Sequence, residues 1–415
     1  SQFIATKYAS DYFQDCLWNT EEGKTIGLSY FKERGFSEGI IKEFKLGYSL
    51  KKQNSFENVA IKSGYDKKVL LDASLIGLNE DGKSYDKFRE RIIFPIHSYS
   101  GKVLGFGGRS FSPQAKSKYL NSGETLIYDK SKILYGLYTS KKAISKEDKC
   151  FIVEGYTDVI SMHQNGIHNV VSASGTALSY SQIHLIKRLT NNVVLLFDGD
   201  KAGMKATIRS IDICLKEEMN VRIVSFPEGE DPDSLSKKLS TIEFQNFLEK
   251  KSINFVDYLI NIYKLNDQTD PAKIIDIKKK IIYSISEIPD VFNREEYCKI
   301  YHTKLNLSEH ALLKQVTKAR SLIKSTPSIY KKNKPREENK KEYTSKNQIK
   351  LEKQEEEILR ILINHGNKTF INNDKEENVA SMIINELHLD KIELSNTIYK
   401  NLYNTIIKII NETNK

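Results

Sequence analysis

The sequence predicts an α/β protein with a parallel β-sheet. The sheet is expected to be flanked by a mixed α+β basic N-terminal lobe and a C-terminal helical bundle, followed by a linker and a small all-α region. Short apolar runs alternate with amphipathic helical segments between residues 148 and 240, and the next segment has a helical period throughout. Apolar strands that alternate with helices are typical of a parallel sheet covered on both faces. The 415 residues are enough for several hydrophobic cores.

Five parts are expected along the chain. They are a basic N-terminal lobe (1–147), a sheet domain (148–240), a helical bundle (241–325), a flexible linker (326–352) and a helical region (353–415). Sheet strands are expected at residues 151–154, 169–174, 192–198 and 221–227, with helices between them at 158–166, 179–189 and 202–218. In the basic lobe, apolar runs at 92–96 and 102–108 flank the turn sequence HSYSG and predict a β-hairpin.

The composition indicates a cytosolic globular protein. Hydrophobic residues make up 39% of the chain, and no apolar run reaches the roughly 18 residues that cross a bilayer. The first residues lack the pattern of a signal peptide, so no membrane association is expected. The four cysteines are scattered without a CxxC pair, which argues against a disulfide framework and against zinc in this chain. The net charge of +10 suits a polyanionic partner such as nucleic acid or nucleotides.

Acidic residues follow three of the four predicted sheet strands. They are Glu154 with Asp158 one helical turn later, Asp198 with Asp200, and Asp231 with Asp233. The carboxyl ends of parallel strands meet at one edge, where six carboxylates would repel one another unless cations lay among them. Oxygen ligands without His or Cys favour Mg²⁺ or Mn²⁺ over zinc. The alternative for the DGD motif is structural, with Asp198 as a helix cap and Asp200 solvated.

The motifs EGYTD, SASGTAL, FDGDKAG and GEDPDSL, in this order and spacing, resemble the Toprim fold of bacterial DnaG-type primases. Toprim acids also occur in topoisomerases and some nucleases, so the discrimination comes from outside the sheet. Upstream, KERGFSEGIIKEFKLGYS, KFRERIIFPI, GKVLGFGGR, KYLNS and YDKSKILYGL are similar to the RNA polymerase core of these primases. The resemblance covers about residues 20–325.

The resemblance implies synthesis of short RNA primers from ribonucleoside triphosphates on single-stranded DNA in the bacterial cytoplasm. Glu154, Asp198 and Asp200 are then the expected catalytic residues, and all six carboxylates are expected metal ligands. The alternatives are a Toprim nuclease or topoisomerase-like enzyme, or a non-catalytic binding module. The phosphate-loop pattern GLNEDGKS at residues 77–84 is interpreted as a chance match, because a strand and not a helix is expected after it.

Six basic residues of the N-terminal lobe are candidates for binding nucleotides and nucleic acid. They are Arg34, Arg89, Arg91, Arg109, Lys118 and Lys130. Arg89 and Arg91 alternate on a segment expected to be extended, which would point both to one face. The resemblance assigns Arg34, Arg109, Lys118 and Lys130 to the basic set around template, initiating nucleotide and primer. Taken singly, each is more simply a solvated surface charge.

The chain also departs from the family pattern at both ends. Primases of this family begin with a zinc-binding domain, whose Cys/His cluster is absent here, so the sequence is expected to be a fragment that starts after it. The last region stands in the place of the family's helicase-binding domain but is short for that role. Truncation at Lys415 and docking to the replicative helicase are therefore expectations.

Overall fold

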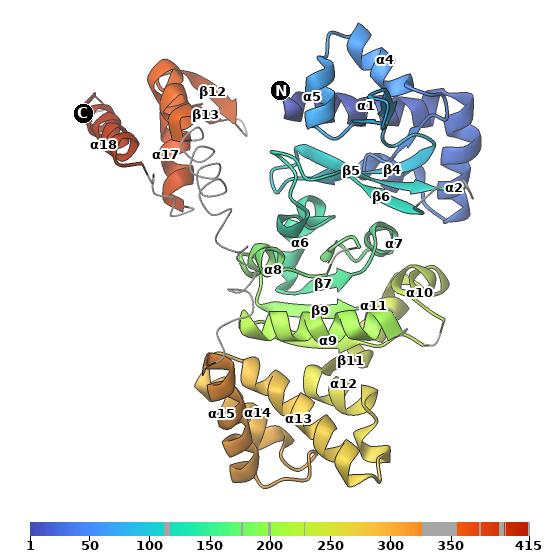
Figure 1. Cartoon of the computed structure of the whole chain (residues 1–415), viewed down its shortest axis with the longest axis vertical. Coiled ribbons are helices and arrows are strands. Elements are labelled where there is room, and N and C mark those ends of the chain that lie inside the picture. The colour runs from blue at the N-terminus through green and yellow to red at the C-terminus, as the bar shows by residue number, and fades with distance from the viewer. Residues whose placement is uncertain are drawn as a thin grey trace. The chain divides into compact units, whose positions relative to one another are not determined.

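A computed structural model describes residues 1–111, 117–175, 177–197, 201–227, 229–325, 355–372, 375–389, 394 and 396–413. The chain separates into two compact units, Ser1–Ile323 and Lys324–Lys415 (Figure 1). The linker expected at residues 326–352 lies outside the described residues, as do Asp198 and Asp200.

The N-terminal lobe is built on an antiparallel sheet with the order β1-β4-β5-β6. Its strands are β1 (Gly47–Ser49), β4 (Arg91–His97), β5 (Val103–Ser110) and β6 (Tyr119–Asn121). The predicted hairpin is confirmed, since β4 pairs antiparallel with β5 across a turn where Gly101 has a φ of +86°. Both faces of this sheet are buried. Ile92 and Phe94 point into one core and Ile93 into another, as the alternation of a strand requires.

Helices and a small hairpin complete the lobe. The helices are α1 (Gln2–Asn19), α2 (Ser29–Glu33), α3 (Glu38–Glu43), α4 (Ser55–Lys62) and α5 (Lys67–Asp72), with a π-helical turn at Gly23–Leu28. The next helix, α6 (Leu137–Glu147), packs Leu137 and Ile144 into the core of the second sheet instead. The hairpin pairs β2 (Ile76–Leu78) with β3 (Ser84–Asp86). Residues 77–84, which match the phosphate-loop pattern, form this hairpin. No helix opens after them, so the structural context of a phosphate loop is missing at this place.

The second sheet has the order β11-β10-β9-β7-β8. Its four predicted strands are present and parallel: β7 (Cys150–Val153), β8 (Val170–Ser172), β9 (Asn192–Leu196) and β10 (Asn220–Val224). A fifth strand, β11 (Ser252–Asn254), pairs antiparallel with β10 at the edge. The prediction that residues 241–325 are helical throughout is therefore wrong at this point. Three residues are too few to interrupt a helical period visibly in the sequence.

Helices cover both faces of this sheet, as the apolar strands predicted (Figure 1). Along β9, Val193 and Leu195 join a core with α8 (Tyr180–Lys187) and α9 (Lys201–Lys216). Val194 and Leu196 join another core with α7 (Tyr156–Gln164), α10 (Pro232–Lys238) and α11 (Thr241–Lys251). The second core also contains Ile92 and Phe94 of the N-terminal lobe. One continuous apolar core thus fixes the lobe against the α7 face of the sheet.

A helical bundle follows and shares the α8/α9 core. It consists of α12 (Phe255–Ile262), α13 (Pro271–Glu287), α14 (Val291–Tyr301) and α15 (Glu309–Ser325), with a short 3₁₀ turn at Leu265–Asp267. Asp270 begins α13 by accepting a hydrogen bond from the backbone N–H of Ala272, and a proline occupies the first turn. Both features are typical helix starts.

The second unit contains a helix at residues 355–365, α17 (Val379–Leu389) and α18 (Thr397–Thr413). The three expected helices are therefore present, but the region is not all-α. The strands β12 (Thr369–Asn372) and β13 (Lys375–Asn378) pair antiparallel between the first two helices. The segment TFINNDKEEN is largely polar, so it resembles a loop in the sequence.

All four cysteines are buried and free of disulfides. In the part of the chain that the structure describes, no helix combines the length and the apolar character needed to cross a membrane.

Candidate active site

Glu154 lies at the carboxyl end of β7, where the chain turns into α7. It is half-buried, and its backbone carbonyl accepts a hydrogen bond from Ser172 Oγ of β8 at 2.7 Å. Glu154 lines a cleft of about 440 Å³ together with residues of the turn after β8 and of α9. Gly155 caps α7, and its backbone N–H donates to Asp158 Oδ2 at 2.9 Å. The EGYTD motif thus places one carboxylate on the cleft and uses another to fix the helix start.

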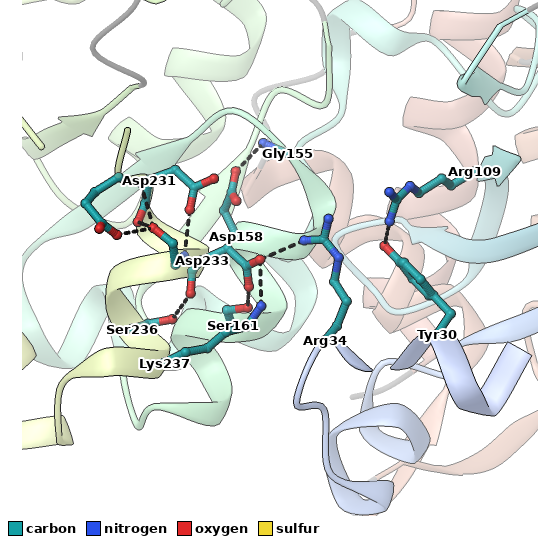
Figure 2. A network of polar contacts seen from close by, with 12 residues as sticks. Tyr30, Arg34, Arg109, Gly155, Asp158, Ser161, Asp231, Asp233, Ser236 and Lys237 are labelled. Atoms are coloured by element: carbon teal, nitrogen blue, oxygen red, sulfur yellow. Dashed lines mark hydrogen bonds and ion pairs between the residues drawn. The ribbon is translucent and has the colours of Figure 1, made fainter. Parts of the chain in front are cut away.

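The DPDS motif forms the start of α10 (Figure 2). Asp231 Oδ1 accepts a hydrogen bond from the backbone N–H of Ser234 at 2.6 Å, so Asp231 is the helix cap. Asp233 is only 6% exposed. Its Oδ2 accepts from Arg34 Nη1 at 2.7 Å and from Lys237 Nζ at 2.8 Å, and its Oδ1 accepts from Ser161 Oγ. In this arrangement protein donors occupy both oxygens of Asp233.

The remaining two carboxylates, Asp198 and Asp200, fall outside the described residues. They follow β9, which lies beside β7 in the sheet, and Phe197 before them lines the same cleft as Glu154. Among the residues that the structure does describe, no group of three or more His, Cys, Asp or Glu side chains is arranged to hold a metal ion. The assignment of all six carboxylates as metal ligands stays a prediction.

Two of the predicted basic residues meet around one tyrosine (Figure 2). Tyr30 lies on α2, and its ring is 5.6 Å from the guanidinium of Arg34 and 4.6 Å from that of Arg109. Arg109 Nη1 also donates to the Tyr30 hydroxyl. Burial raises the pKa of Tyr30 in spite of the two cations, which lower it. The Tyr30 side chain therefore lies between two cations, of which Arg34 contacts Asp233 at the acidic edge.

Arg109 has an aromatic setting that extends to the surface. Its guanidinium lies 5.4 Å from the ring of Phe111 and 5.9 Å from that of Tyr119, its cross-strand neighbour on β6. These rings are 43% and 42% exposed. Cations beside exposed aromatic rings are typical of surfaces that bind single-stranded nucleic acid.

Arg91 has a structural role instead. It is 9% exposed, and its guanidinium donates to the carbonyl oxygens of Gly108, Ser117 and Lys118. Burial lowers its pKa. The expectation that Arg89 and Arg91 point to one face of a strand is wrong, because β4 begins at Arg91 and Arg89 lies exposed in the preceding turn.

Lys118 and Lys130 lie on the connections around β6. Lys118 is exposed, and its backbone carbonyl accepts from the Ser110 N–H. Lys130 begins a 3₁₀ turn at Lys130–Lys132, next to the half-buried Lys87. Burial, together with the charge of Lys130, lowers the pKa of Lys87. The sequence reasoning did not single out Lys87, although it stands in the KFRERIIFPI motif.

Sequence reasoning also missed two cations of the cleft. Lys205 and Arg209 lie one turn apart on α9 and line the cleft with Glu154. Both are exposed, and neither forms an ion pair with a described residue. Like charges four residues apart repel each other on a helix, so an anion between them would be stabilising. The signal was present in the sequence, as two cations at helical spacing directly after FDGDKAG.

Comparisons with known proteins agree with this geometry. Residues 12–141 match the family model of the DNA primase catalytic core, N-terminal domain, and residues 151–236 match a Toprim-like model. The structure is similar to a DNA primase domain from Pseudomonas aeruginosa, with 30% identity and a TM-score of 0.69 over 77% of this chain and 100% of that one. This chain belongs to the DnaG-type bacterial DNA primases.

Other relatives extend the similarity. The Escherichia coli primase catalytic core is 30% identical with a TM-score of 0.66, covering 74% of this chain and 98% of that one. A DnaG primase catalytic domain solved bound to single-stranded DNA is also 30% identical, with a TM-score of 0.65 over 74% and 96%. The curated DNA primase of Clostridium acetobutylicum is 33% identical over 401 residues, which are 96% of this chain and 63% of that protein.

The DNA primase of Halalkalibacterium halodurans is 35% identical over 309 residues, covering 74% of this chain and 51% of that protein. The chain therefore spans about half to three fifths of the length of these two curated relatives. Residues 337–414 match a model described only as a domain of unknown function. Primases with a Toprim domain generally use a divalent metal ion.

Proposed function

We propose that this chain is a primase catalytic core, which synthesises short RNA primers on single-stranded DNA from ribonucleoside triphosphates during replication in the bacterial cytoplasm. The observation that carries the proposal is the meeting of two separate parts at one place. The acidic edge of the Toprim sheet lies against a basic lobe of the primase type, and Arg34 of that lobe contacts Asp233 of that edge at 2.7 Å. A nucleotidyltransferase needs both, because it must bind phosphates and stabilise charge on one of them.

The proposed metal is Mg²⁺ or Mn²⁺, held by Glu154, Asp198 and Asp200, with Asp158, Asp231 and Asp233 close to it. The donor set fits, since carboxylate oxygens are the ligands these ions prefer and Glu154 is half-buried on a cleft. When bound, the ion would lower the pKa of the attacking 3′-hydroxyl and neutralise charge on the reacting phosphate. Asp233 could join the set only by exchanging its contacts with Arg34 and Lys237.

The chain's own residues would then have distinct roles. The hydrogen bond from Ser172 Oγ to the Glu154 carbonyl fixes the backbone at the end of β7. The Glu154 side chain lines the cleft from this fixed position. Arg34 and Arg109, fixed around Tyr30, would bind phosphates of the nucleotide or template from the lobe side. Lys205 and Arg209 would bind phosphate oxygens from the α9 side of the cleft. Arg89, Lys118 and Lys130 are proposed to contact the nucleic acid backbone.

The nuclease or topoisomerase alternative rests on the Toprim acids alone. It leaves the N-terminal lobe unexplained, although that lobe matches a primase model over residues 12–141. The primase proposal accounts for both parts of the unit Ser1–Ile323 with one reaction.

The second unit is proposed to dock to the replicative helicase. Ile398, Leu402 and Ile409 of α18 are 74%, 41% and 56% exposed, and their spacing places them along one side of the helix. Such an apolar stripe suits a protein partner. Ile398→Asp is expected to abolish co-elution of the chain with the helicase in size-exclusion chromatography, and unchanged co-elution would contradict this assignment.

The test of the main proposal is primer synthesis by the purified chain. It is incubated with single-stranded DNA, labelled ribonucleotides and Mg²⁺ or Mn²⁺, beside Glu154→Gln and Asp198→Ala, and products are separated on a denaturing gel. Template-dependent short RNA is expected from the unchanged chain only, with the fold and DNA affinity of both variants retained. Cut or relaxed DNA would replace the primase assignment by the nuclease or topoisomerase one.

A further inference from the structure

One amide side chain of the Toprim domain binds the backbone of the turn that carries Arg34. Residues 34–37 connect α2 to α3, and Gln164 is the last residue of α7. Gln164 Nε2 donates to the Gly35 carbonyl at 2.6 Å, and its Oε1 accepts from the Ser37 N–H at 2.7 Å. One side chain therefore binds backbone atoms on both sides of Phe36.

The backbone of this turn is held by that contact together with its own hydrogen bonds, since the N–H groups of Gly35 and Phe36 donate to the carbonyls of Lys32 and Phe31, both at 2.8 Å. Gly35 has a φ of +74°, a conformation that costs glycine little, and Ser37 is the N-cap of α3. The amide of an N-cap residue has no acceptor inside its own helix, and here the exposed side chain of Gln164 supplies one for the Ser37 N–H. Phe36 between them is 4% exposed and packs into the shared core.

The same helix also reaches the guanidinium of Arg34. Ser161 of α7 donates to Asp233 Oδ1, and Asp233 Oδ2 accepts from Arg34 Nη1 at 2.7 Å (Figure 2). The nine residues of α7 span about 13 Å, from the EGYTD acids at its start to Gln164 at its end. Residues of α7 thus contact the backbone next to Arg34 directly and its guanidinium through Asp233, and α7 itself begins two residues after Glu154.

We propose that Gln164 is a positioning residue for Arg34. Its amide holds the turn so that the guanidinium stands at the acidic edge, ready to bind a phosphate group of a nucleotide or of the template. This inference rests on the proposed function and deepens it. Nucleotide and template both present phosphate oxygens to Arg34, and the experiment below decides which of the two Arg34 binds.

The test compares Gln164→Ala, Arg34→Ala and their double variant in the full chain. The KM for ribonucleoside triphosphate, kcat and the Kd for a labelled single-stranded DNA are measured for each. Gln164→Ala is expected to raise whichever of KM and Kd Arg34→Ala raises, by roughly 5- to 30-fold, the factor that one or two ordinary hydrogen bonds supply. kcat should stay within about twofold, because Gln164 touches no reacting group. The double variant should be no worse than Arg34→Ala alone.

Asn192→Ala is the matched control. Asn192 also has an amide side chain, and its Nδ2 donates to the carbonyl and Oδ2 of Asp148, both at 2.9 Å. It is the first residue of β9 and therefore lies at the amino-terminal ends of the strands, away from the acidic edge. It should change neither constant. Gln164→Glu keeps an acceptor for Ser37 but loses the donor to Gly35, so an effect between wild type and Gln164→Ala is expected.

Hydrogen exchange provides a readout that does not depend on catalysis. The Ser37 amide should exchange faster in Gln164→Ala and unchanged in Asn192→Ala. If the unchanged chain made no RNA, the proposed function would fail. Hydrogen exchange at Ser37 and the Kd values for DNA and ATP would still test the backbone clamp, by which we mean the two hydrogen bonds of Gln164 to Gly35 and Ser37. Additive losses in the double variant would overturn the inference. So would faster exchange at Ser37 with unchanged KM and Kd, or lower thermal stability as the only effect.

Discussion

Replacing Asp212 by Asn should stabilise this protein at neutral pH. Asp212 lies on α9 and accepts a hydrogen bond from Ser284 Oγ of α13 at 2.8 Å. Burial raises the pKa of Asp212 to about 6, and nearby Glu287 raises it further, against Ser284 and Lys216, which lower it. Asn keeps the acceptor for Ser284 but cannot ionise. The substitution therefore removes the cost of a buried charge without removing the hydrogen bond.

The sign and size follow from linkage. A carboxyl whose pKa is raised from 3.8 to about 6 binds its proton more tightly in the folded state, so stability falls as pH rises between these values. The raised pKa gives a loss of up to about 3 kcal/mol at pH 7.5 and about half of that at pH 5. The advantage of Asp212→Asn over wild type should therefore grow by about 1 kcal/mol between pH 5 and pH 7.5.

The assay is the melting temperature of both proteins from pH 5 to pH 7.5. For a unit of 323 residues, the growing advantage corresponds to a Tm difference that widens by about 2 °C. Asp276→Asn is the control, since Asp276 lies on α13 with an exposed side chain and pairs with Lys280 at 2.7 Å. A Tm difference for Asp212→Asn that stays constant, or narrows, as pH rises would refute the reasoning.

Three further predictions concern single side chains. Arg91→Ala should destabilise the lobe by about 2 to 3 kcal/mol, because it leaves the carbonyls of Gly108, Ser117 and Lys118 without their donor. Arg89→Ala is the control and should leave the Tm unchanged. Equal Tm values for the two variants would contradict the structural role of Arg91. Gly107→Ala should cost about 1 to 3 kcal/mol in urea unfolding, because a Cβ there would stand 2.5 Å from the ring of Tyr156, which is stacked on Phe94. Gly39→Ala is the control, since its Cβ would make only an ordinary contact of 3.8 Å with Ser37 Oγ. An equally stable Gly107→Ala would show that the Tyr156 ring can move. Arg209→Ala should raise the KM for nucleotide about tenfold without changing Tm, and an unchanged KM would remove Arg209 from the site.

The sequence predicted those features that a local pattern encodes. The residues from Val193 to Leu196 are all apolar because they alternate between two hydrophobic cores. Such an unbroken apolar run is typical of a parallel strand covered on both faces, which is what the sequence predicted here. The hairpin of β4 and β5 was visible because turn residues separate two apolar runs. By contrast, β11 has three residues and exists because β10 offers a free edge, which no local pattern records.

The candidate site was predictable in its residue types and less so in their partners. Arg34 and Asp233 are 199 positions apart, and the sequence named both without indicating that they bind each other. Arg91 and Arg89 are nearly adjacent and chemically identical, yet one is buried against carbonyl oxygens and the other is exposed. Burial is decided by tertiary packing. The sequence alone therefore cannot tell whether a basic residue beside a strand binds a ligand or supports the structure.

The contact between Arg34 and Asp233 has a consequence for how substrate would enter the site. Asp233 is 6% exposed and has two cationic partners, so removing Arg34 would leave Lys237 and Ser161 as its donors and not an isolated buried charge. Arg34 can therefore leave Asp233 for a phosphate at modest cost. The backbone clamp of Gln164 keeps the turn in place during that exchange, because it binds Gly35 and Ser37 and not the guanidinium. An arginine with a fixed backbone and an exchangeable partner can serve an anion that arrives and leaves in every catalytic cycle.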